Sequence, residues 1–146
     1  KVYDAGSVMT ARDVFAELPF GNKTVVLAMS GVDVMAALEN AVSKIEDTSG
    51  RFMQVSGNMA VVYDRNAAGG SRVVSASING SAIDAGATYT VATNDFLARG
   101  GDGYGMFAGA EVVLSADASQ LMASHVVDYI RENGISEGPQ GRISFQ

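Results

Sequence analysis

The sequence contains no cysteine, a single histidine and no long apolar run. Without cysteine the chain has no disulfide, no thiolate metal ligand and no cysteine nucleophile. With only His125, a metal centre built on several imidazoles is excluded, and a serine–histidine–aspartate triad would have one candidate base. We interpret His125 as a partly exposed helix residue. No apolar stretch approaches the roughly 20 residues of a membrane span, so we expect no membrane-spanning segment.

Positive charge is also scarce. The 10 Lys and Arg residues are scattered among 16 Asp and Glu, which gives a net charge of −6 and a pI near 4.6. Because a surface that binds nucleic acid needs clustered cations, a nucleic-acid polymer is not an expected partner. The apolar content of 47% is typical of a globular chain. We expect one domain over residues 1–146, and the opening Lys1 suggests a piece excised from a longer protein.

Hydrophobic patterning predicts an α+β fold with helices packed on the outside of a mostly antiparallel or mixed sheet core. Thr10 and Asp13 resemble a capping box, and Ser30 and Asp117 are suited to cap later helices. Helices are expected at residues 11–17, 31–47 and 118–133, the last closed by Gly134. Strands are expected at residues 23–30, 51–55, 59–64, 72–78, 81–84, 88–93, 111–114 and 142–145.

The most distinctive stretch is a glycine-rich turn that ends in an aromatic residue. Gly100, Gly101, Asp102 and Gly103 directly precede Tyr104. Because glycine accepts positive φ and close approach of other groups, the turn could present the tyrosine ring to something flat. In the alternative interpretation, the tyrosine fills the core. Asp102 could bond nearby amides or a ligand hydroxyl.

A second stretch places an aromatic residue on an exposed loop. Pro19 ends the first helix, and Phe20 follows it with few obvious core neighbours. Phe20 is therefore either a plug or a binding ring. Phosphate binding by the glycine turn is not expected, because residues 100–105 match neither a phosphate loop nor a dinucleotide fingerprint.

Four segments in order carry a resemblance to a known family: Leu-Pro-Phe-Gly-Asn at 18–22, Gly-Arg-Phe-Met-Gln-Val-Ser-Gly at 50–57, Tyr-Asp at 63–64, and residues 94–104. Together they resemble the C-terminal domain of bacterial and animal 5′-nucleotidases. That family includes periplasmic UDP-sugar hydrolases and surface ecto-5′-nucleotidases. The resemblance implies a layered α-β-β-α fold that holds a nucleoside.

The resemblance also implies roles for individual residues. The base would be stacked between Phe20 and Tyr104, with Asn22 bonding its edge. Glu111 lies nearest to the position of the family's ribose-binding aspartate, and the family's Asn-Gly-Gly-x-x-Arg segment would precede residue 1. The candidate substrate-binding residues are Phe20, Gly21, Asn22, Asn94, Asp102, Gly103, Tyr104 and Glu111.

The expected function is that of a nucleoside- or nucleotide-binding specificity domain in a 5′-nucleotidase-type phosphohydrolase. The resemblance implies no catalytic residue and no metal in this chain. Two divalent metal ions would lie in a covalently linked N-terminal metallophosphoesterase domain, so the chain alone would be inactive. The alternatives are the same domain of a 2′,3′-cyclic-nucleotide phosphodiesterase or UDP-sugar hydrolase, and an interaction module that has lost ligand binding. A periplasmic, secreted or cell-surface bacterial protein is expected.

Overall fold

A computed structural model describes residues 2–4, 6–47, 49–135 and 138–146. The strands are β1 (Thr24–Ser30), β2 (Met59–Tyr63), β3 (Val73–Ile78), β4 (Ser81–Ala82), β5 (Thr88–Asn94), β6 (Glu111–Leu114) and β7 (Ile143–Phe145). The helices are α1 (Ala11–Glu17), α2 (Gly31–Val42), α3 (Asp95–Ala98), α4 (Gly105–Ala108) and α5 (Met122–Asn133), with short 3-10 turns η1 (Gly101–Gly103) and η2 (Ala116–Ala118).

The strands form two sheets, one in the order β5-β1-β6 and the other in the order β4-β3-β2-β7. Every pair is antiparallel except β2 and β7, which run parallel. The predicted α+β class with a mostly antiparallel, mixed sheet core is therefore confirmed.

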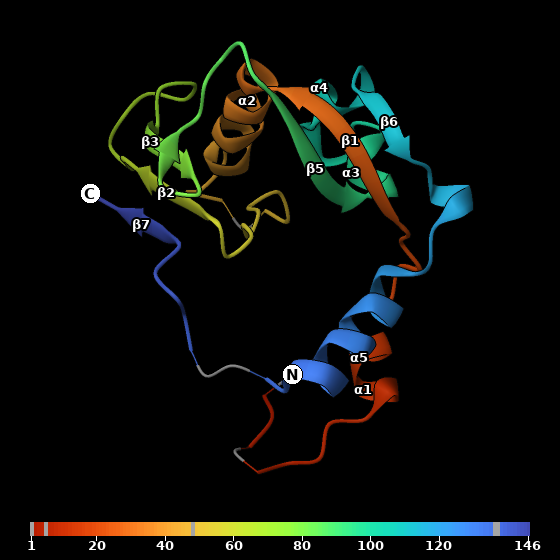
Figure 1. Ribbon diagram of the computed structural model, residues 1–146. Helices are drawn as coiled ribbons and strands as arrows, with labels where there is room; N and C mark the ends of the chain where they lie inside the picture. Colours follow the sequence, from red (N-terminus) through yellow and green to blue (C-terminus); the bar gives the residue numbers. More distant parts are fainter. Residues whose placement is uncertain (1, 5, 48, 136–137) are drawn as a thin grey trace.

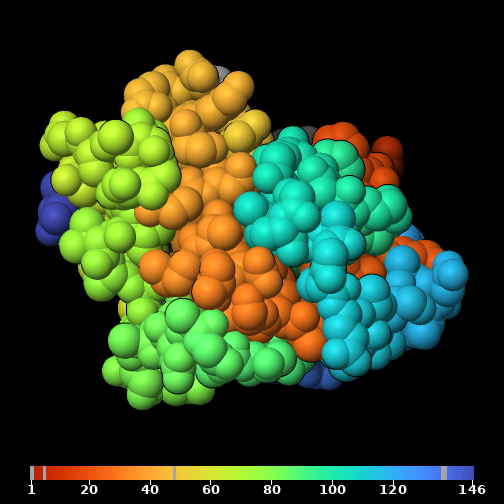
Figure 2. Space-filling view, turned by 90° about the horizontal axis from the view of Figure 1, so that it is seen from above, coloured from red at the N-terminus to blue at the C-terminus, as the bar shows by residue number. Residues whose placement is uncertain are grey.

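Helix α2 lies between the two sheets and packs on both (Figure 1). Figure 2 shows one side of α2 as an orange band between the yellow-green β2–β3 region and the teal region that follows β5. Its Val34 and Ala37 pack with β1, whereas Leu38 and Val42 pack with β2 and β3. Two buried faces on one helix divide the interior into two clusters. The first cluster contains Leu27, Met29, Val34, Ala37, Tyr104 and Phe107, and the second contains Leu38, Val42, Val55, Val61, Tyr63 and Ala76.

Several predicted helix ends are confirmed. Thr10 and Asp13 form the reciprocal capping box at the start of α1. The Ser30 hydroxyl accepts the backbone N–H of Asp33, at 3.2 Å, at the start of α2. Gly134 follows α5 with a φ of 72°. These local signals are reliable because each satisfies a backbone group that the helix itself leaves unpaired.

Other boundaries differ from the prediction. Helix α5 begins at Met122 and not at residue 118, and Asp117 belongs to η2 instead of capping α5. The delay has a tertiary cause, because Leu121 forms an isolated bridge with Lys23 and is held extended. Helix α2 ends at Val42, earlier than the predicted residue 47.

The strand predicted at residues 51–55 is absent from the structure. Side chains instead bind the carbonyls at both ends of this segment. The Tyr104 hydroxyl donates to the Arg51 carbonyl at 2.5 Å, and the Arg142 Nη1 donates to the Val55 carbonyl at 2.8 Å. These two carbonyls therefore have hydrogen-bond partners without a neighbouring strand.

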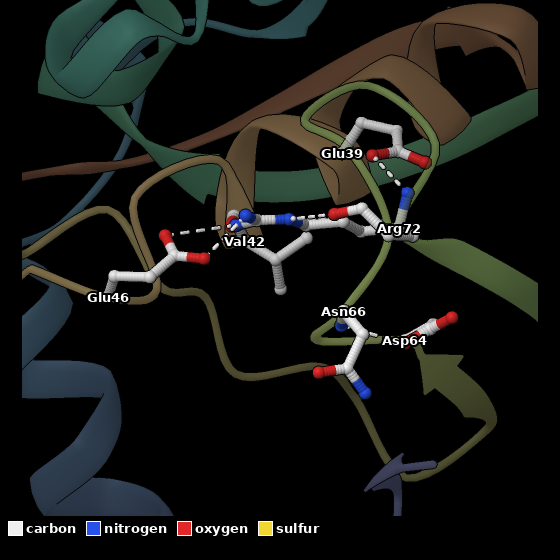
Figure 3. Close-up of polar contacts among 7 residues, drawn as sticks. Glu39, Val42, Glu46, Asp64, Asn66 and Arg72 are labelled. Atoms are coloured by element: carbon white, nitrogen blue, oxygen red, sulfur yellow. Dashed lines mark hydrogen bonds and ion pairs between the residues drawn. The ribbon is translucent and has the colours of Figure 1, made fainter.

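Arg72 fastens the loop between β2 and β3 to α2 (Figure 3). Its guanidinium donates to the Val42 carbonyl at 2.6 Å and to the two carboxylate oxygens of Glu46 at 3.2 and 2.5 Å. Its backbone N–H donates to Glu39 at 3.0 Å. Only 9% of Arg72 is exposed. One buried cation therefore closes the C-terminal end of α2 and orders the adjoining loop.

Helices α1 and α5 pack against each other and stand apart from the two sheets (Figure 1). Each has one buried residue, Val14 in α1 and Ala123 in α5. Within the part of the chain that the structure describes, every helix is too short or too polar to cross a bilayer.

Candidate functional site

The two aromatic motifs begin side by side at one end of the β5-β1-β6 sheet. Thr24 at the start of β1 pairs with Asn94 at the end of β5. Just beyond this pair, the Lys23 N–H donates to the Asp95 carboxylate at 3.0 Å, and the Asp95 N–H donates to the Lys23 carbonyl at 2.9 Å. The antiparallel register therefore brings the 18–22 loop and the 94–104 segment to the same edge of the molecule.

Phe20 is held outward on its loop and is 84% exposed, as one of the two sequence interpretations required. Gly21 has a φ of 63°, and the carbonyl of Asn22 accepts the N–H of Met122 at 2.8 Å. A cavity of about 30 Å³ lies behind the ring. It has room for about one water molecule, so a flat ligand could lie on Phe20 but could not enter the cavity. The cavity is lined by Phe15, Leu18, Phe20, Gly21, Asn22, Leu121, Met122 and Ala123.

Tyr104 corrects the expectation that the glycine turn displays its ring. Only 1% of the residue is exposed, and its ring stacks on Phe107 with centroids 5.1 Å apart. Burial raises the pKa of Tyr104 to about 12. Because the ring is packed in the first core cluster, neither face is open, and the structure does not form the expected pair of facing rings with Phe20. The core-filling interpretation of Tyr104 describes this arrangement.

Packing explains why the turn before Tyr104 is rich in glycine. Gly103 has a φ of 81°, and a Cβ at this position would lie 2.9 Å from the Asn40 amide oxygen. The Asn40 amide nitrogen donates to the carbonyl of Asp102 at 3.1 Å. The turn therefore closes tightly onto α2, while the side chain of Asp102 stays at the surface.

Two further candidate substrate-binding residues, Asn94 and Glu111, have other positions or roles in the structure. The Asn94 side chain accepts the N–H of Leu97 at 2.9 Å and so caps α3. Glu111 is exposed and pairs with Ala28. Ala28 lies four positions along β1 from Thr24, about 13 Å at the rise of a strand. Glu111 is therefore not brought to the edge that carries Phe20 and Asn22.

Sequence reasoning missed two connections in this region. The first is the reciprocal pairing of Lys23 with Asp95, and the second is the link of Asn40 and Arg51 to the glycine turn. The partners in these links are separated by about 50 or more positions along the chain, and no local spacing points to them.

No metal centre is evident in the described ranges 2–4, 6–47, 49–135 and 138–146. No three His, Asp or Glu side chains there are grouped so that they could hold an ion. His125 is exposed in the middle of α5.

Comparison with known proteins places the chain in a family. A family model described as 5′-nucleotidase, C-terminal domain, matches residues 2–109. The chain belongs to this family. The sequence resemblance to 5′-nucleotidases is thereby confirmed, and it rests on a match that contains both aromatic motifs.

Full-length 5′-nucleotidases are among the similar proteins. The chain is 33% identical over 147 residues to a snake venom 5′-nucleotidase from Macrovipera lebetinus. The aligned region is 94% of this chain and 35% of the relative. It is 38% identical over 112 residues to a trifunctional nucleotide phosphoesterase protein of Bacillus subtilis, covering 73% of this chain and 8% of that protein. The solved 5′-nucleotidase precursor from Thermus thermophilus matches with a TM-score of 0.86 at 37% identity, over 94% of this chain and 28% of that one. The chain thus spans about a third or less of these relatives.

Proposed function

We propose that this chain is the nucleoside-recognition domain of a 5′-nucleotidase-type phosphohydrolase, and that the substrate base stacks on Phe20. The observation that carries the proposal is the ring itself, 84% exposed on a loop fixed beside the start of β1. A large flat side chain held in water gains by covering its face with another flat group. Each such base stack contributes about 1–3 kcal/mol. Membership of the 5′-nucleotidase family supports a nucleotide as the ligand.

Two polar side chains, Asn22 and Asp102, are proposed to supply the rest of the recognition. The Asn22 backbone carbonyl accepts the Met122 N–H, which fixes this part of the loop. The Asn22 side-chain amide, two positions after Phe20, is proposed to donate to and accept from a base edge. Asp102, exposed on the glycine turn, is proposed to meet the ribose hydroxyls. Asn94 and Gly103 act indirectly, since one caps α3 and the other allows the turn to close on α2.

A base held between Phe20 and Tyr104 is a second geometry. It requires the glycine turn to release the tyrosine ring from the core. The release would cost about 1 kcal/mol for the bond to the Arg51 carbonyl and about 2 kcal/mol for the buried ring. A clamp of this kind would therefore form only on binding. Tyr104→Phe keeps the ring and removes the hydroxyl that bonds the Arg51 carbonyl. Because the ring would then be released at a lower cost, a binding-induced clamp predicts tighter adenosine binding in this variant.

Phosphate hydrolysis is assigned to another part of the protein. We propose that residues 1–146 form one recognition domain linked to an N-terminal metallophosphoesterase domain. That domain would hold two divalent metals, which would supply an activated water for hydrolysis. The coverage of only 28% of the Thermus thermophilus protein supports this division. The isolated chain is then expected to be inactive. A secreted, periplasmic or surface location in a bacterium is proposed, and the venom relative supports export.

Titrating adenosine into the chain while recording backbone amide shifts tests this function. We expect saturable shifts at Phe20, Gly21 and Asn22, and a roughly 5- to 150-fold loss of affinity in Phe20→Leu, as expected for about 1–3 kcal/mol of stacking. Phe15→Leu is the matched control, because Phe15 lines the same small cavity and is 42% exposed. Equal losses in both variants would contradict stacking on Phe20.

Other substrates and a non-catalytic role make different predictions. A 2′,3′-cyclic-nucleotide phosphodiesterase or a UDP-sugar hydrolase could use the same ring, and a substrate panel on the full protein would separate them. The burial of Tyr104 is the observation that favours an interaction module without ligand. That role predicts no saturable shift with adenosine, adenosine monophosphate or uridine.

A further inference from the structure

A larger cavity of about 320 Å³ lies away from Phe20, at the C-terminal end of α2. Its wall is formed by the α2 end and the segment that follows it, by the loop after β2, and by β7. It has no residue in common with the small cavity behind Phe20. The lining residues are Ala41, Lys44, Ile45, Asp47, Ser49, Arg51, Phe52, Arg65 and Phe145.

The wall of this cavity is positively charged, although the whole chain carries −6. Lys44 and Arg51 come from the segment after α2 and Arg65 from the loop after β2, and Asp47 is the one carboxylate in the lining. Within the described residues, none of the three cations forms an ion pair with a carboxylate. Three cations against one carboxylate give the lining a net positive charge, which attracts an anion.

Arg51 is the cation of this wall that carries a buried, unpaired donor. Its Nη1 donates to the Ser43 hydroxyl at 3.0 Å and to the Asn40 amide oxygen at 3.4 Å. Its Nε is buried and has no hydrogen-bond partner among the described residues. Native structures rarely leave a buried donor unpaired. An anion in the adjacent cavity would stabilise this guanidinium electrostatically, because the buried surroundings screen charge weakly.

Two phenyl rings also line the cavity. Phe52 and Phe145 are stacked with centroids 6.4 Å apart, and Phe145 is 38% exposed. The Arg65 guanidinium lies 4.4 Å from the centroid of the Phe145 ring. A flat ring on the ligand could pack against these phenyl faces, while its charged group reaches the cations.

From this combination we propose that the cavity is a second binding site, for a small organic anion that carries a phosphate or carboxylate on a flat ring. The oxyanion meets Lys44, Arg51 and Arg65, and the ring packs on Phe52 and Phe145. The site needs neither Phe20 nor the nucleoside-binding function proposed above.

The test uses phenyl phosphate as the probe and follows the Arg Nε–H and backbone amide signals of the chain by NMR. We expect saturable shifts at Arg51, Phe52 and Phe145 in the range of millimolar or tighter affinity, and at least a tenfold weaker affinity in Lys44→Gln/Arg65→Gln. Both replaced side chains lie in the cavity wall and outside the core clusters, so folding should be retained. Phe20→Leu should leave phenyl phosphate binding unchanged, which separates this site from the nucleoside site.

The matched control is the double variant Arg12→Gln/Arg131→Gln, which also removes two positive charges, from exposed side chains on α1 and α5 outside the cavity wall. Equal weakening in this control would overturn the site, because it would show only a response to net charge. Absence of saturable shifts with phenyl phosphate would overturn it as well. Inorganic phosphate binding as tightly as phenyl phosphate would overturn the role of the ring, and phenol binding as tightly would overturn the role of the anion.

Discussion

The α2 region and the α1–α5 pair are built very differently. Helix α2 is packed from two sides by sheets, and six of its residues are buried. The α1–α5 pair buries one residue in each helix and leaves Phe15 and Tyr129 exposed, and Phe20 is exposed on the loop that follows α1. The glycine turn belongs to the first region and Phe20 to the second. The proposed nucleoside site thus joins a rigid side to a thinly packed one, and such thinly packed regions are where binding surfaces commonly adapt.

The largest effect on stability is expected from truncating a core side chain in α2. Leu38 is 1% exposed in the second core cluster. We expect Leu38→Ala to lower the free energy of unfolding by about 2–5 kcal/mol, through lost burial and the cavity that remains. Urea unfolding followed by circular dichroism measures the change. Val113→Ala, at a residue 59% exposed on β6, should change stability by less than about 0.5 kcal/mol. Similar losses in the two variants would show that α2 is not the packing centre.

The next effect concerns Arg72, which joins α2 to the loop after β2. Arg72→Ala removes donors from the Val42 and Ala67 carbonyls and from Glu46. We expect a loss of about 1–3 kcal/mol in the same unfolding experiment. The control is Arg131→Ala, whose partner Asp128 is also exposed, and there the loss should stay below about 0.5 kcal/mol. A neutral Arg72→Ala would contradict the structural role of the network.

Alanine substitutions at two glycines with positive φ, one in each region, allow a direct comparison of the regions. Gly103 in the turn has a φ of 81° and meets Asn40, whereas Gly21 beside Phe20 has a φ of 63° and open space around it. Alanine is strained at both, by about 1–2 kcal/mol. Only Gly103→Ala adds a clash, so it should have the lower midpoint of thermal unfolding. Gly105→Ala, with open space at its Cβ and in α4, should be nearly neutral. A Gly21→Ala variant less stable than Gly103→Ala would reverse the assignment of rigid and adaptable sides.

The smallest effect is a pH dependence at the end of α2. The hydrogen bond from Arg72 lowers the pKa of Glu46 from the ordinary 4.5. A lowered carboxylate pKa contributes stability that is present above 4.5 and is lost as the pH falls through the lower, folded-state value. The side chain of Glu46 is 60% exposed, so the contribution is small. Thermal unfolding at pH 6 and pH 3 should show a smaller drop in Glu46→Gln than in the natural chain. An identical drop in the unfolding temperature of both proteins would show that groups other than Glu46 cause the loss of stability in acid.

The sequence by itself determined the class of fold, the family and several helix ends, although it did not predict the short helices α3 and α4. The capping box of Thr10 and Asp13, the Ser30 cap and Gly134 were predictable because each satisfies a backbone group within a few residues. The asparagine–glycine turn after β3 is equally local, with φ of 52° at Asn79 and 78° at Gly80.

Only the tertiary structure decided where the two aromatic rings point and which distant groups meet. Tyr104 turns inward because Asn40 and Arg51, far away in sequence, close around its turn. Likewise, the carbonyls of residues 51 and 55 are bound by side chains from elsewhere, and the predicted strand does not form. Local sequence reports which backbone groups need partners, whereas burial depends on which segments the fold brings together, and that is a property of the whole chain.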